Sequence, residues 1–350
     1  MSAALVDWRL AERVAAAVAA DARPARLDGE MAVAACAWAE PRVRAYTGLD
    51  AWRAPGPELI GRPAWSRNAL ATMRELSEPL EGRVAAGIGL PGPLGALAHS
   101  AAGSAAAVEV GVAAGYAARR VLGQYDVALA RPRPARLLLV TPNLEAAARD
   151  LGAPLEPFLR WIALHELTHA AQFQAVAWLR DHVAGLVREL VEGVARELSS
   201  AGLGTLARGI ATTDPRRALR ALLQGQLPAL LLSGEQRAAL DRLQAAMALL
   251  EGHAEHVMDA AAPGDAGLRG RLDARRAARS GLGEIVGRLL GLEMKLRQYR
   301  LGKAFCDRVV EERGIEALNA AWSEPAALPR LDELEAPERW LERTAERAAA

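Results

Sequence analysis

Apolar residues recur at helical spacing along most of the chain. Between residues 155 and 187 they return every three or four positions, which predicts a long helix. A second helix is predicted over residues 233–262, because Ser-Gly-Glu-Gln at its start is typical of a helix N-terminus. A third is predicted from about residue 283 to 314. Helices should therefore form most of the fold.

The clearest strand-like patterns lie in one segment, GQYDVALARPRPARLLLVTPNL. Its best candidates are Val127–Ala130 and Arg136–Thr141, separated by a proline-rich turn and followed by Pro142 and Asn143. Two strands so close in sequence predict a small antiparallel sheet. The fold class is therefore mainly α with a small β-sheet, an α+β protein.

The first 80 residues alternate helical patterns with proline-containing turns. Small residues dominate the segment 104–122, which should let neighbouring helices approach closely. Four tryptophans in this region are predicted core residues: Trp8, Trp38, Trp52 and Trp65. We expect a helical region, 1–122, packed on a core formed by 123–350, or a single integrated domain.

Composition narrows the range of partners and locations. The 350 residues are 51% hydrophobic but only 4% aromatic, so the core must consist mainly of Ala, Leu and Val, which favours closely packed helices. The 43 basic and 42 acidic residues are interspersed, which argues against nucleic acid as a partner.

The two cysteines, Cys36 and Cys306, show no metal-binding spacing and support no disulfide framework. The N-terminus has the pattern of an amphipathic helix and not of a signal peptide. The most apolar stretch, residues 84–118, is broken by prolines and carries polar residues, so no membrane span is expected. We expect a cytoplasmic protein.

The strongest chemical signal is the sequence HELTH at residues 165–169. His165 and His169 are four residues apart, so on a helix both imidazoles project from one face and can bind one metal ion. Glu166 lies beside them. A zinc ion (Zn2+) held by three protein ligands keeps one position for water and lowers the pKa of that water, and a nearby carboxylate can accept its proton. The motif therefore predicts both a zinc site and its general base.

A third protein ligand is expected in the segment MALLEGHAEHVMD, residues 247–259. The segment offers five candidates, and spacing alone does not choose among them: Glu251, His253, Glu255, His256 and Asp259.

The sequence LEGHAE resembles the glutamate helix of gluzincins, zinc peptidases in which an HExxH helix is followed by a second helix that presents a glutamate. The resemblance implies that Glu251 is the third ligand and that Glu255, one turn later, orients a zinc-bound histidine. The interval between the two helices is longer than in the familiar gluzincin aminopeptidases, which keeps His253 and His256 as alternatives. By resemblance to some gluzincins, Tyr299 is a candidate donor to the oxyanion, and the alternative is a tyrosine that only packs. By resemblance to zincins, Arg136–Thr141 is a candidate edge strand that pairs with a peptide, and the alternative is a purely structural strand.

A wider set of motifs is similar to a bacterial zincin-like metallopeptidase family named for an association with deazaflavin coenzyme biosynthesis. The motifs are GQYD (123–126), LLLVTPNL, HELTHAAQF, LEGHAEHVMD, KLRQY (295–299), Gly302, Phe305, Leu318-Asn319 and Trp322. The resemblance implies a zinc-dependent hydrolase fold, and no residue argues for binding the coenzyme itself.

These patterns predict a zinc-dependent metallohydrolase, specifically a peptidase that acts on a peptide or protein substrate. His165, His169 and Glu251 would hold zinc, and Glu166 would act as general base. Two alternatives stay open. The chain can be a catalytically silent zincin scaffold with a structural or partner-binding role, because a fold does not dictate an activity, or an amidohydrolase of small molecules.

Overall fold

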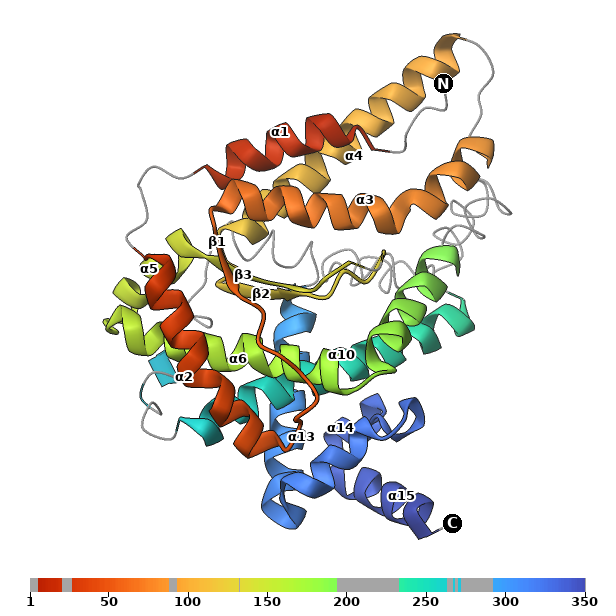
Figure 1. The fold of residues 1–350 in the computed structure, drawn as a ribbon. Coiled ribbons are helices and arrows are strands. Elements are labelled where there is room, and N and C mark those ends of the chain that lie inside the picture. The colour runs from red at the N-terminus through yellow and green to blue at the C-terminus, as the bar shows by residue number, and fades with distance from the viewer. Residues whose placement is uncertain are drawn as a thin grey trace.

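The computed structural model describes residues 6–20, 27–87, 93–131, 133–193, 233–262, 267, 270–271 and 292–349. Most of these residues are helical, and three short strands form one sheet, as the expected α+β class requires. Figure 1 shows the sheet between two groups of helices, with α1, α3 and α4 on one side and α2, α6 and α10 on the other. The last helices, α14 and α15, lie at the end of the molecule farthest from α1.

The first group of helices packs through small residues. It consists of α1 (Trp8–Ala19), α3 (Arg62–Gly87) and α4 (Pro93–Ala118). The side chain of Asp7 caps α1 by accepting a 3.0 Å hydrogen bond from the Leu10 amide. A Cβ on Gly111 in α4 would lie 2.6 Å from the carbonyl oxygen of Ala11 in α1. The predicted close approach of small-residue helices is therefore confirmed.

The sheet has the strand order β1-β3-β2. Its strands are β1 (Pro57–Ile60), β2 (Gly123–Asp126) and β3 (Arg136–Val140). The antiparallel pairing of β2 with β3 agrees with the expected hairpin, whereas β1, which pairs in parallel with β3, was not predicted.

The expected strand Val127–Ala130 is wrong. The strand lies directly before these residues, at Gly123–Asp126. Ala128 has a left-handed backbone (φ 52°), which is incompatible with extended pairing. The expected strand Arg136–Thr141 ends one residue sooner than predicted, because Thr141 begins helix α5 (Thr141–Asp150).

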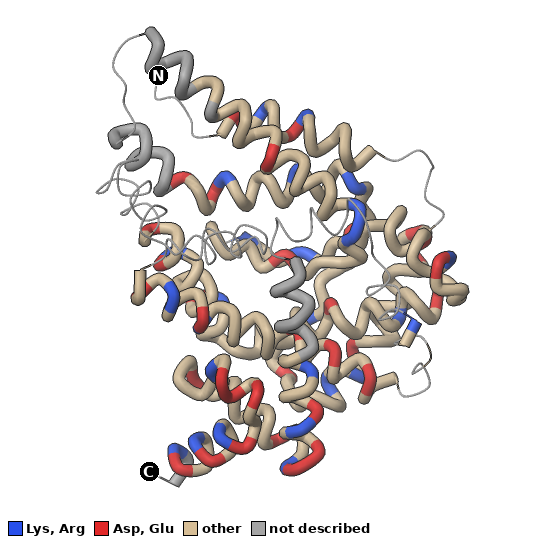
Figure 2. The backbone as a smooth tube through the Cα atoms, turned by 180° about the vertical axis from the view of Figure 1, so that it is seen from behind, with Lys and Arg blue, Asp and Glu red and all other residues tan. Residues whose placement is uncertain are grey.

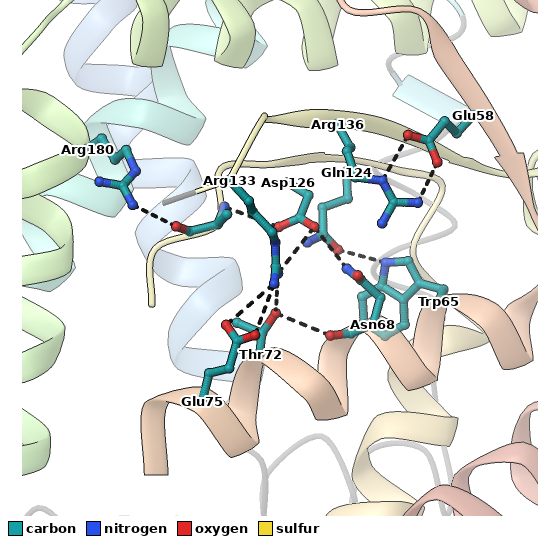
Figure 3. A network of polar contacts seen from close by, with 11 residues as sticks. Glu58, Trp65, Asn68, Thr72, Glu75, Gln124, Asp126, Arg133, Arg136 and Arg180 are labelled. Carbon is teal, nitrogen blue, oxygen red and sulfur yellow. Dashed lines mark hydrogen bonds and ion pairs between the residues drawn. The ribbon is translucent and has the colours of Figure 1, made fainter. Parts of the chain in front are cut away.

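The sheet is joined to α3 by a network of polar side chains (Figure 3). The Trp65 ring donates a 2.7 Å hydrogen bond to Gln124 in β2, and the amide of Asn68 donates to Asp126 at 3.1 Å. Across the sheet, Arg136 in β3 forms an ion pair with Glu58 in β1. The bonds from Trp65 and Asn68 fix β2, the strand next to the candidate site, against α3.

The second group of helices forms the largest core. Helix α2 (Gly29–Thr47) packs on α6 (Leu155–Ala175), and the buried side chains between them include Val43, Leu164 and Leu167. The prediction of one long helix over 155–187 is wrong in its end point. It ends at Ala175, and a new helix begins at Leu179 after a turn in which the Trp178 ring N–H donates to the carbonyl of Trp322 at 3.1 Å.

A second core joins α10 to the C-terminal helices and buries Leu249, Phe305 and Trp340. Its elements are α10 (Gly234–Ala261), α13 (Leu292–Asn319), α14 (Leu331–Glu335) and α15 (Pro337–Ala349), with short 3-10 turns at Ala320–Trp322 and Pro325–Ala327. The predicted helix 233–262 is confirmed, with Ser233 and Gln236 forming a reciprocal cap. The expected start of the third helix near residue 283 lies outside the described residues, and its expected end at Gly314 coincides with a break in helical geometry (φ 79°).

Other expectations from the sequence have mixed outcomes. Trp8, Trp52 and Trp65 are buried as predicted, whereas Trp38 is only partly buried. Both cysteines are buried and free.

The first 122 residues contribute α2 and β1 to the same core and sheet as later elements. The domain boundary expected at residue 122 stays a prediction.

The surface of the described residues mixes both charge signs. Figure 2 shows acidic and basic residues interspersed along the helices, most densely at the C-terminal end. Within the described part of the chain, no helix has the length and apolar character needed to cross a membrane.

Candidate metal centre

Helix α6 carries the HELTH segment through the middle of the protein. Apolar side chains bury most of its surface, including Phe158, Leu164 and Leu167, and this packing holds the helix rigidly between α2 and α10. His165 and His169 project from one side, one turn apart. Their Nε2 atoms lie 3.2 Å from each other, with the two rings nearly perpendicular. The helix therefore presents two imidazole nitrogens to one point.

Helix α10 brings Glu251 to the same point. Its Oε2 atom lies 3.4 Å from Nε2 of His165 and 3.6 Å from Nε2 of His169. Ligand atoms about 2 Å from a tetrahedrally bound zinc ion lie about 3.3 Å from one another. The three measured separations match this value, so the residues fit a zinc ion as they stand. Within the described part of the chain, this is the one group of three such side chains with metal-binding geometry.

The two alternative ligands point elsewhere. Nδ1 of His253 lies 2.9 Å from the side-chain nitrogen of Gln172. His256 lies between Tyr46, whose hydroxyl is 2.6 Å from Nε2, and Asp307, whose carboxylate is 2.7 Å from Nδ1. The structure thus brings Glu251, and neither of these histidines, to His165 and His169.

The three side chains are electrostatically coupled without a metal. Burial opposes a charge on His169, but the carboxylate of Glu251 outweighs it and raises the pKa of His169 to about 9. Burial likewise opposes the charge of Glu251, yet the two imidazoles hold its pKa well below the ordinary value. Glu251 and His169 therefore favour each other's charged forms in the absence of a metal.

Glu166 is buried and faces strand β2. Its Oε2 atom accepts a 2.9 Å hydrogen bond from the backbone N–H of Tyr125. A Cβ on Gly123 would lie 2.8 Å from its Oε1 atom, so only glycine leaves room for the carboxylate there. Burial raises the pKa of Glu166, although the two neighbouring histidines oppose that shift. A carboxylate with a raised pKa beside a metal centre is suited to accepting a proton.

The edge strands of the sheet are β1 and β2, so the prediction that Arg136–Thr141 is an edge strand is wrong. Strand β3 is central, with β1 on one side and β2 on the other. Its residues Leu137–Val140 are buried, as a strand covered on both faces requires. Among the described residues no strand pairs with the outer edge of β2, which is the strand whose Tyr125 contacts Glu166.

Nδ1 of each of the two histidine ligands contacts a side chain that the sequence did not single out. Nδ1 of His165 lies 3.2 Å from the sulfur of Met258, and Nδ1 of His169 lies 2.8 Å from Oε1 of Gln172. Both partners were present in quoted motifs, LEGHAEHVMD and HELTHAAQF. A position three residues after His169 shares its helix face, which is the signal that could have identified Gln172.

The two remaining sequence-predicted residues stay predictions. Glu255 is buried on α10, one turn after Glu251, and its expected contact with a zinc-binding histidine is untested. The side chain of Tyr299 lies outside the described residues, although its backbone belongs to α13.

The comparisons with known proteins identify the family of the chain. The model of a family described as zincin-like metallopeptidase matches residues 6–341. A crystal structure of a proposed hydrolase with a novel fold from Chloroflexus aurantiacus is similar to the chain at 27% sequence identity and a TM-score of 0.68. That similarity covers 97% of this chain and 99% of the other. No curated protein matches the chain, and the deazaflavin association stays untested. Since the family match spans nearly the whole sequence, the chain belongs to the zincin-like metallopeptidase family.

Proposed function

We propose that the chain is a zinc-dependent peptidase in which His165, His169 and Glu251 hold the ion. The observation that supports this most is the set of separations among the three ligand atoms, 3.2, 3.4 and 3.6 Å, which is the spacing of a tetrahedral zinc site. The family and the similarity to a proposed hydrolase point to the same class of reaction.

Glu166 is the general base of the proposed reaction. A bound zinc ion supplies a water molecule of lowered pKa and polarises a carbonyl group. Glu166 takes a proton from the attacking water and delivers it to the leaving amine nitrogen, so the carboxylate ends the cycle as it began. The Tyr125 N–H holds one carboxylate oxygen in place and leaves the other for the water. Tyr299 stays a proposed donor to the oxyanion.

The outer edge of β2 is the proposed binding edge for a peptide. The Val140 amide donates to Leu122 across the hairpin at 2.9 Å, so Leu122 and Gln124 face β3, while Gly123 and Tyr125 face outward. The Tyr125 N–H is already bonded to Glu166, which leaves the N–H and C=O of Gly123 and the C=O of Tyr125 for a substrate. An extended main chain can pair with these groups directly above the proposed base.

Metal analysis and peptide digestion test the proposal together. Purified protein should contain one zinc ion per chain and should cleave members of a peptide library. Glu166→Gln should keep the zinc and lose at least about 100-fold in kcat/KM. Glu156→Gln is the matched control, because Glu156 is an exposed acid on the same helix that pairs only with Arg160 among the described contacts.

The outcomes separate the competing functions. Absence of stoichiometric zinc, or cleavage unchanged in Glu166→Gln, would overturn the proposed mechanism. Zinc without any hydrolysis would favour a silent scaffold. Cleavage of single-residue amides but not of longer peptides would favour a small-molecule amidohydrolase, because only a peptide can use the edge of β2. The amides of a cleaved peptide can be N-methylated one at a time, which removes one N–H from each derivative. Cleavage should fall most for the derivative that has lost the N–H bonded to Gly123.

A further inference from the structure

A buried amide side chain connects the proposed metal centre to helix α10. Gln172 has no exposed surface and touches three polar groups. Its Oε1 atom lies 2.8 Å from Nδ1 of His169. Its Nε2 atom lies 3.0 Å from the carbonyl oxygen of Leu250 and 2.9 Å from Nδ1 of His253. Each polar atom of this amide therefore has a defined partner.

The Leu250 carbonyl determines which way each hydrogen bond runs. A carbonyl oxygen can only accept, so the amide atom next to it must be the nitrogen of Gln172. The second hydrogen of that nitrogen points to His253, whose Nδ1 must therefore accept and carry no proton. The amide oxygen is then left for His169, whose Nδ1 must carry a proton in order to donate. Three bonds thus fix the tautomers of two histidines.

We propose that Gln172 and His253 are positioning residues that hold His169 in its Nδ1–H form and aim its bare Nε2 atom at the metal. This inference rests on the proposed zinc site. Hydrogen bonds from the second nitrogen of a metal-binding histidine commonly orient the ring and raise its basicity. Here the acceptor is an amide, and the amide is itself fixed from α10, the helix that supplies Glu251.

His253 completes the chain of hydrogen bonds. It is fully buried, and its ring lies edge-on to Trp322 with the centroids 5.3 Å apart. Its Nε2 atom has no hydrogen-bond partner in the described structure. Leaving a buried N–H unsatisfied is costly, so a histidine is retained here at the expense of stability. An apolar residue would avoid that cost but would leave one N–H of Gln172 unsatisfied and the amide less firmly held.

The two histidine ligands are held unequally. The partner of His169 is an amide oxygen, a good acceptor, whereas the partner of His165 is the thioether of Met258, a weak one. Removal of the Gln172 amide should therefore loosen the better-fixed of the two ligands. Loss of this amide should weaken zinc binding more than loss of another glutamine amide on α6.

Zinc affinity tests the positioning role. Gln172→Met removes the amide and keeps the length of the side chain, and we expect zinc binding, measured by competition with a chelator, to weaken about 10- to 100-fold. Gln174→Met is the matched control, because it makes the same change two residues away. The Gln174 side chain bonds the backbone of Arg53 and the hydroxyl of Tyr125, and not a proposed ligand. Equal zinc affinity in Gln172→Met and wild type would overturn the proposal.

Nitrogen-15 NMR of the histidine rings tests the tautomers directly and needs no activity. In metal-free wild-type protein, His253 should be protonated on Nε2 only. In Gln172→Glu the carboxylate cannot donate, so the proton of His253 should move to Nδ1. In protein loaded with cadmium-113, His169 should couple to the metal through Nε2 and keep a proton on Nδ1. An Nδ1–H form of His253 in wild type, or metal coupling through Nδ1 of His169, would overturn the proposal.

These measurements separate failure of the inference from failure of the proposed function. If wild-type protein binds no zinc, the proposed function fails, while the His253 tautomer in metal-free protein still tests the hydrogen-bond chain. If zinc binds normally but the tautomers or the affinity of Gln172→Met differ from expectation, only the positioning role fails.

Discussion

Gly252 of α10 and Gly302 of α13 lie against each other so closely that a Cβ on Gly252 would overlap the carbonyl group of Gly302. Gly302 in turn faces the backbone of Ala248, one turn earlier on α10. Gly252 directly follows the proposed ligand Glu251. The glycine of the EGHAE pattern is therefore a packing residue, which sets how closely the two helices approach and so where Glu251 lies.

Gly252→Ala should destabilise the protein. The new methyl group meets backbone and not a flexible side chain, so the helices must separate, at a cost of about 1–3 kcal/mol in the free energy of unfolding. Urea denaturation measures this loss, and chelator competition should show weaker zinc binding as well. Gly185→Ala is the control: nothing lies within 4 Å of that position, and alanine there should stabilise the helix by up to about 1 kcal/mol. Unchanged stability in Gly252→Ala would contradict the close packing.

The proposed ligands could be predicted from the sequence because the rules that govern them are local. Four-residue spacing on a helix places His165 and His169 on one face whatever surrounds them. The choice of Glu251 over His253 needed a resemblance, because it depends on how α6 and α10 cross. That crossing is determined by contacts between residues far apart in sequence, such as the bond from Gln172 to the Leu250 carbonyl.

The sheet was harder to predict because its decisive contacts are not local. Strand β1 has four residues, all of intermediate burial, and begins with a proline, so it shows no alternating pattern. It becomes a strand by pairing with β3, about 80 residues away in sequence. That pairing places β3 in the centre and leaves β1 and β2 as the two edge strands, of which β2 contacts Glu166. The position of a binding edge thus depended on a strand that the sequence does not reveal.

Gly123→Ala should impair catalysis without removing the metal. The added methyl group would lie 2.8–2.9 Å from three atoms of the Glu166 side chain, so the carboxylate must move. A misplacement of about 1 Å can cost about 100-fold in rate, and we expect kcat/KM for a library-derived peptide to fall at least about 10-fold. Zinc content should not change, because Glu166 is not a ligand in the proposed site. Gly29→Ala, with open space around it, should leave both quantities as in wild type. Full activity in Gly123→Ala would argue against Glu166 as the base.

Acid should destabilise the metal-free protein partly through His253. Burial, with His256 and His169 nearby, lowers the pKa of His253 to about 3, compared with about 6.5 in an unfolded chain. The unfolded state therefore binds the proton first, and stability falls as the pH drops from about 6.5 towards 3. Between pH 7 and pH 5 this one group should cost about 2 kcal/mol.

The variant His253→Phe isolates that contribution. Phenylalanine keeps a ring against Trp322 but cannot be protonated, so its unfolding free energy should fall about 2 kcal/mol less than that of wild type between pH 7 and pH 5. Urea denaturation in the presence of a chelator measures both proteins without metal. Parallel pH profiles would show that His253 is not held neutral by its surroundings.

Zinc binding should release a proton from the centre. In the metal-free protein Glu251 raises the pKa of His169 to about 9, so at pH 7.5 nearly every molecule carries the extra proton. A metal ion binds to the unprotonated Nε2 atom and must therefore displace the proton from it. The zinc affinity consequently depends on pH. Calorimetric titration with zinc in buffers of different ionisation enthalpy should show release of at least about one proton per ion at pH 7.5. The release from His169 should diminish as the pH passes 9, because the proton is then already lost. A titration at pH 7.5 with no proton release would mean that His169 is already neutral before the metal arrives, and that burial outweighs the effect of the Glu251 carboxylate on its pKa.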